Sequence, residues 1–128
     1  MNNTVTYPWD LVPPKELNAR WSRLTAILKE QFGQDLKLEA ILLLIGMREM
    51  GYGFREYSKQ EKMDLMHVGT CTILAPSGFY EWQHQDEEGW PHWSLTQPLP
   101  YLDIFAQAHF LRYHILQYFE QVFDELNP

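Results

Sequence analysis

The chain has 128 residues, and its 10 Lys and Arg against 17 Asp and Glu give a formal net charge of −7. This length is typical of one domain, and 45% hydrophobic with 15% aromatic residues exclude a disordered or low-complexity protein. The longest apolar run, residues 40–47, is far shorter than the roughly 20 residues that cross a bilayer. The composition therefore predicts a single domain over residues 1–128, with no membrane segment.

Targeting and redox signals indicate a location. The first residues lack the basic start and the apolar stretch of a secretory signal. One cysteine, Cys71, excludes an internal disulfide and is typical of a reducing compartment. We expect a cytoplasmic protein.

The N-terminal segment differs in pattern from the sequence that follows it. Residues 1–13 are rich in apolar side chains but have no helical period, which predicts an extended arm lying on the body of the protein or on a partner. The Pro13-Pro14 pair marks a place where a helix can start, because a proline at the first helical position loses no intrahelical hydrogen bond. The first helix is expected from there to Gly33, with one apolar stripe formed by Leu17, Trp21, Leu24, Leu28 and Phe32.

Two further helices follow. The second is expected from Asp35 as N-cap to Met50, and its run at 40–47, apolar all round, indicates a helix enclosed on most sides. Gly51 or Gly53 would stop it. The third opens with a capping box, in which Ser58 and Glu61 each satisfy a backbone N–H, and it ends before Pro76.

A change of period after Gly78 predicts a β-hairpin. Two aromatic-rich runs, 79–84 and 90–95, flank acidic turn residues that end in Gly89. The length of the turn leaves two strand registers possible, and a shift of one residue between them moves every side chain to the other face. A three-residue loop would pair His84 with His92, and a four-residue loop would pair Trp82 with Trp93.

A long last helix is expected from about Asp103. Its apolar face is wide, because several large side chains, Phe123 among them, fall outside the main stripe. The stripe consists of Ile104, Ala108, Leu111, Ile115, Phe119, Val122 and Leu126. The predicted fold class is mainly α, a four-helix domain with one β-hairpin between helices three and four. The sequence encodes more apolar surface than one small domain readily buries.

Residues 58–96 resemble the second half of a winged-helix domain. The residues that carry the resemblance are the turn Leu74-Ala75-Pro76-Ser77-Gly78 and the strands Phe79-Tyr80-Glu81 and Trp93-Ser94-Leu95-Thr96. It implies a recognition helix over Ser58–Thr72 and a wing at Asp86-Glu87-Glu88, hence a nucleic-acid regulator as one alternative. Phosphates would be repelled by that wing and by the net charge of −7, which argues against nucleic acid. A protein-binding winged helix would tolerate this charge.

Histidines suggest a second alternative, a metal-binding protein or metal-dependent enzyme. His67 and Cys71 are four residues apart on the predicted third helix, a spacing that can hold a metal. If His84 and His92 pair across the hairpin and meet His67, the three could form a metal site. The competing interpretation is cross-strand aromatic packing.

The leading hypothesis is a non-enzymatic protein–protein interaction module. No recognised catalytic motif is present, and we expect no cofactor. Aromatic side chains anchor many interfaces, because each buries a large area at small conformational cost. The candidate binding residues are Tyr80, Trp82, Trp90 and Trp93 of the hairpin and Phe123 of the last helix. The expected partner is another protein or a second copy, which would make a homodimer.

Overall fold

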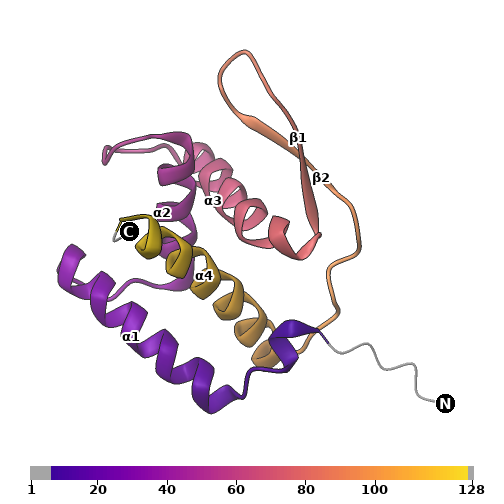
Figure 1. Ribbon diagram of the computed structural model, residues 1–128. Coiled ribbons are helices and arrows are strands. Elements are labelled where there is room, and N and C mark those ends of the chain that lie inside the picture. The colour runs from indigo at the N-terminus through magenta and orange to yellow at the C-terminus, as the bar shows by residue number, and fades with distance from the viewer. Residues whose placement is uncertain (1–6, 127–128) are drawn as a thin grey trace. The chain divides into compact units, whose positions relative to one another are not determined.

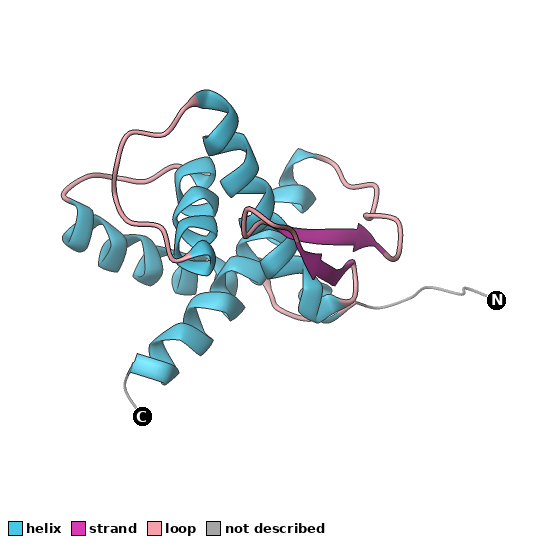
Figure 2. Cartoon of the chain, turned by 90° about the horizontal axis from the view of Figure 1, so that it is seen from above, coloured by secondary structure: helices cyan, strands magenta, loops and turns pink. Residues whose placement is uncertain are grey.

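The computed structural model describes the backbone of residues 7–126 and the side chains of residues 7–124. Within this range the fold is mainly helical, with one antiparallel hairpin between the third and fourth helices (Figure 2). The elements are η1 (Pro8–Asp10), α1 (Pro14–Phe32), α2 (Leu38–Met50), α3 (Lys59–Leu74), η2 (Ala75–Ser77), β1 (Tyr80–Gln85), β2 (Pro91–Leu95) and α4 (Ile104–Leu126). The predicted fold class is confirmed.

The contacts within the chain divide it into two compact units. Unit 1 combines residues 1–35 with 101–128 and contains η1, α1 and α4. Unit 2 spans residues 36–100 and contains α2, α3, η2 and the hairpin. A single domain over 1–128 stays a prediction.

In unit 1, α1 and α4 run in the same direction (Figure 1). Their paired side chains show this, because Asn18 contacts Arg112 and Arg20 forms an ion pair with Glu120. The predicted start of α1 at the Pro13-Pro14 pair is confirmed, with Pro13 as N-cap and Pro14 as the first helical residue. The described buried side chains are Trp9, Leu17, Leu24, Leu28, Phe110, Tyr113, His114, Ile115, Leu116 and Val122.

The start of α4 follows the sequence, and the first turn of its apolar stripe is exposed. The Oδ1 atom of Asp103 accepts a hydrogen bond from the backbone N–H of Ala106 at 2.8 Å, as expected of an N-cap. Ile104, the first residue of the predicted apolar stripe, is 80% exposed. Helical periodicity shows which residues share a face, but not which turns of that face are covered.

The N-terminal arm is only partly as expected. Residues 1–6 of the arm lie outside the described residues. Pro8–Asp10 form a 3-10 turn, which corrects the prediction of an extended segment. The turn buries the Trp9 ring against α4, with centroids 4.9 Å from Phe110 and 5.2 Å from His114. The arm therefore contributes to the core of unit 1.

In unit 2, α2 begins two residues later than expected. Lys37, with extended backbone, is the N-cap, and Asp35 was wrongly given that role. The Asp35 carboxylate instead lies 3.5 Å from the ammonium of Lys29, which belongs to unit 1 as Asp35 does. At its other end α2 stops at Gly51, whose φ of 70° suits glycine. None of residues 40–47 is exposed, which confirms the enclosed helix.

The helices α2 and α3 touch backbone to backbone. A methyl group added at Gly46 would lie 1.9 Å from the carbonyl oxygen of Leu65, and one at Gly69 would lie 2.3 Å from that of Leu42. No side chain larger than hydrogen fits at either position without moving a helix. The capping box of Ser58 and Glu61 at the start of α3 is present as predicted.

The hairpin contains both registers that the sequence left open. Trp82 pairs with Trp93 and His84 pairs with His92, because a β-bulge between them adds one residue, Gln83, to β1. The Nε2 atom of Gln83 donates to the Ser94 hydroxyl at 2.8 Å. A bulge lets one strand satisfy two pairings that a regular ladder makes exclusive.

Candidate functional site

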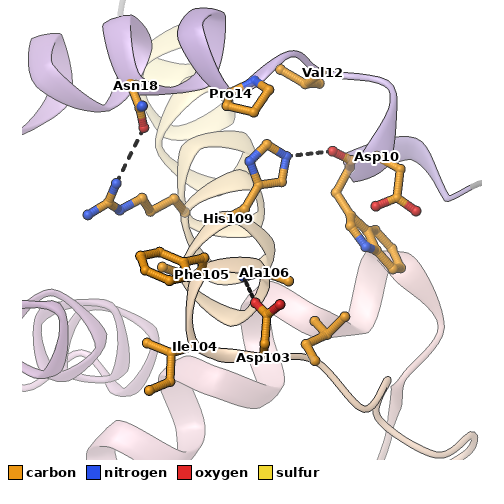
Figure 3. A pocket seen from close by; sticks show the side chains of 13 residues that line it. Asp10, Val12, Pro14, Asn18, Asp103, Ile104, Phe105, Ala106 and His109 are labelled. Atoms are coloured by element: carbon orange, nitrogen blue, oxygen red, sulfur yellow. Dashed lines mark hydrogen bonds between the residues drawn. The ribbon is translucent and has the colours of Figure 1, made fainter.

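A cavity of about 640 Å³ opens in unit 1 (Figure 3). Its walls come from residues between Trp9 and Asn18 on one side and between Leu102 and Arg112 on the other. We call this cavity the α4 groove. Its volume lies in the range of sites that hold a small ligand or a few side chains of a partner.

Large apolar side chains stand at the edge of the α4 groove. Ile104 is 80% exposed and Phe105 is 87% exposed, although both line the groove. They extend from the first turn of α4, as Figure 3 shows. Tyr101, just before this turn, is fully exposed, and Leu11 is exposed beside the opposite wall. Exposed apolar side chains gathered around a cavity are characteristic of binding surfaces.

His109 joins the two walls of the groove. Its Nε2 atom lies 2.7 Å from the backbone oxygen of Trp9, and Figure 3 shows the contact. A carbonyl oxygen only accepts hydrogen bonds, so Nε2 carries the proton and donates it. In the neutral ring Nδ1 is then the acceptor. This bond fixes the N-terminal turn to α4 and so helps to shape the groove.

Arg112 brings a positive charge to the same groove. Its guanidinium donates to the Asn18 Oδ1 atom at 3.4 Å and lies 5.3 Å from the centroid of the Trp21 ring. Among the residues whose side chains the structure describes, no carboxylate forms an ion pair with it. The guanidinium is thus held in place by neutral groups and keeps donors for an external acceptor.

Two acidic residues line the groove as well. Asp103 is engaged as the N-cap of α4. Asp10 accepts a hydrogen bond from the Tyr7 backbone N–H at 3.4 Å. In Figure 3, Asp10 lies on one side of His109 and Asn18, the neighbour of Arg112, lies on the other. The groove therefore has an acidic end and a basic end.

A buried aromatic cluster lies beneath the N-terminal turn. The His114 ring is enclosed by Trp9, Phe110 and Tyr113, with centroids 4.6 to 5.2 Å away. Its Nδ1 atom donates to the Phe110 backbone oxygen at 2.7 Å. Burial lowers the pKa of His114, because the charged ring would lose its hydration. The cluster gives Trp9 a packed aromatic support.

The five sequence-predicted binding residues fall in both units. In unit 2, Trp82 is 53% exposed, while Tyr80, Trp90 and Trp93 are half-buried. Phe123, the fifth residue, is half-buried in unit 1, beside a hollow of about 200 Å³ between α1 and α4.

The hairpin tryptophans line a second hollow. Trp82 and Trp93, together with Glu49, border a space of about 320 Å³ in unit 2. The Trp93 Nε1 atom is buried and has no hydrogen-bond partner among the described residues. Trp90 meets the Tyr52 ring edge-on at 5.8 Å. The hairpin aromatics therefore combine packing within unit 2 with partial exposure.

The histidines proposed as metal ligands have other neighbours. The Nε2 atom of His67 lies 3.5 Å from Cys71 Sγ, and burial raises the pKa of that thiol to about 11. His84 and His92 stack with centroids 4.6 Å apart, and the Nε2 atom of His92 lies 2.9 Å from an Asp86 oxygen. Within residues 7–124, no three His, Cys, Asp or Glu side chains form a group that could hold a metal ion.

Sequence reasoning did not identify Arg112 or Phe105 as binding residues. The available signals were weak, namely an arginine within an apolar face and a phenylalanine outside the main stripe. Both become candidate binding residues only because they line the same cavity.

Comparison with known proteins finds no matching family model, no similar curated protein and no similar solved structure. No described helix has the length and apolar character needed to cross a membrane.

Proposed function

We propose that this chain is a non-enzymatic module that binds another polypeptide through the α4 groove. The observation that carries the proposal is the exposure of Ile104 and Phe105, at 80% and 87%, beside a cavity of about 640 Å³. Burying such side chains in an interface releases water from apolar surface. Arg112 adds a positioned charge, and aromatic residues and arginine are enriched in interface centres.

The polar groups of the groove support binding rather than catalysis. Asp103 caps a helix, and the Nε2 atom of His109 donates to a backbone oxygen. The described residues that line the groove include no serine, threonine or cysteine that His109 could activate. A histidine whose Nε2 atom is engaged in a structural hydrogen bond is consistent with a binding surface.

The hairpin is a second contact surface in this proposal, centred on Trp82. The hairpin aromatic residues are among the binding residues predicted from the sequence. The 53% exposure of the Trp82 side chain supports that role. A cytoplasmic location also belongs to the proposal, on the single cysteine alone.

The test is to select peptides that bind the full chain from a randomised library and to map them by NMR. We expect the shifted amides to cluster at residues 104–112 and 9–18. Phe105→Asp should weaken binding at least tenfold, because a charge would replace the exposed ring. Phe54→Asp is the matched control, since Phe54 is also exposed but belongs to unit 2. Equal loss in both variants, or shifts scattered over the chain, would contradict the proposal.

A further inference from the structure

We infer that the partner in the α4 groove is a second copy of this chain, with Phe105 of each copy entering the groove of the other. This inference rests on the proposed function and names its partner. It follows from two independent features of one surface, its shape and its charge.

The shape of the surface is self-complementary. Phe105 protrudes at 87% exposure from the edge of a cavity that it also lines. Small side chains at Ala106 and Ala108 leave room in the wall of that cavity. In a two-fold interface the same surface faces itself, so a protrusion and a cavity on one patch can fill each other twice.

The charges of the surface are also self-complementary. Arg112 has no carboxylate partner among the described side chains, and Asp10 lies across His109 from the Asn18 that holds Arg112 (Figure 3). A two-fold axis between these ends brings Asp10 of one copy to face Arg112 of the other. Two ion pairs would form, each beside a buried aromatic ring.

The net charge of −7 works against association of two copies. Repulsion between distant charges is screened beyond about 8 Å at physiological ionic strength, whereas paired groups in contact are screened less. The local pairing of Arg112 with Asp10 therefore decides the contact. Association should be weakest at low salt, where the long-range repulsion is strongest.

The first test is sedimentation equilibrium of the full chain at micromolar to millimolar concentration. We expect a reversible dimer that Phe105→Ala weakens at least tenfold. Phe54→Ala should leave the dimer unchanged, because that exposed ring belongs to unit 2. A wild-type chain that stays monomeric throughout, or equal weakening by both changes, overturns the inference.

A mixing experiment tests the reciprocal insertion itself. Ala108→Trp should fill the groove while keeping the protruding Phe105, and alone it should also weaken the dimer. An equimolar mixture with Phe105→Ala should form heterodimers more tightly than either variant pairs with itself, because one insertion remains possible. No gain on mixing overturns the reciprocal arrangement.

Charge-reversal variants test the same dimer without placing a tryptophan in the groove. Arg112→Glu and Asp10→Lys should each dissociate the dimer, and their mixture should restore it. If the chain is monomeric while selected peptides still shift residues 104–112, the second-copy inference fails and the proposed function stands. If neither peptides nor copies bind there, both fail.

Discussion

The helix pairs of the two units pack in opposite ways. In unit 2, α2 and α3 touch through Gly46 and Gly69, with no side chain between their backbones at these points. In unit 1, α1 and α4 are joined by long side chains such as Arg112 and leave hollows of about 640 and 200 Å³ beside their contact. Backbone contact leaves no room between α2 and α3 at these two glycines, whereas contact through side chains leaves hollows beside α1 and α4 that a partner can use.

The two helix pairs also differ in what stabilises them. The α2–α3 pair depends on two positions that must stay free of a methyl group. Unit 1 depends on one large ring, Trp9, which is 4% exposed and packs on α4 from the N-terminal turn. Substitutions at these points test the comparison directly.

The largest effect is expected for Trp9→Ala. Removing a buried tryptophan should lower the free energy of unfolding by about 3–5 kcal/mol. The measurement is urea denaturation followed by far-ultraviolet circular dichroism. Trp82→Ala is the control, because that side chain is about half exposed and should cost about 1 kcal/mol or less. Similar losses for the two variants would mean that the N-terminal turn does not anchor unit 1.

Gly46→Ala should lower the free energy of unfolding by about 3 kcal/mol, because the new methyl would force α2 away from α3. Gly53→Ala is the matched control, since a methyl there meets no atom within 4 Å. Its effect should stay within about 0.5 kcal/mol. Equal stability of the two variants, measured by the same denaturation, would contradict backbone contact between the helices.

A pH effect is expected for unit 1. Burial lowers the pKa of His114 in the folded protein below its ordinary value of 6.5, so below that pH the unfolded chain binds a proton that the folded chain does not. Stability should therefore fall as the pH falls below about 6.5, by at most about 1.4 kcal/mol per pH unit. His114→Gln should remove this slope. The measurement is the urea midpoint of the wild-type and variant chains from pH 7.5 to 5. An unchanged slope in the variant would mean that another group causes the pH dependence.

The last prediction concerns the chemical reactivity of Cys71, which reports on unfolding of unit 2. Its thiol is buried and its pKa is raised to about 11, so the reactive thiolate is scarce at pH 8. Labelling with an aromatic disulfide reagent should be at least about 100-fold slower in the folded protein than in urea. Gly46→Ala should accelerate labelling, whereas Trp9→Ala should do so only if the two units unfold together.

Local signals in the sequence determined most of the element boundaries. The capping box at Ser58, the proline that starts α1 and the glycine that ends α2 are all confirmed. Each is an interaction within about four residues, so its outcome depends little on distant parts of the chain. Asp35 failed as an N-cap although aspartate is a preferred capping residue, because its carboxylate contacts Lys29 and Lys37 takes the N-cap position without a side-chain hydrogen bond.

Tertiary structure alone decided the features on which function rests. The exposure of Ile104 and Phe105, the lack of a carboxylate beside Arg112 and the contact at Gly46 depend on which distant residues come near. Periodicity states which side chains share a face, but it carries no information on whether another segment covers that face. The amino-acid order therefore specified helices, turns and the hairpin, whereas three-dimensional packing determined where a cavity remains.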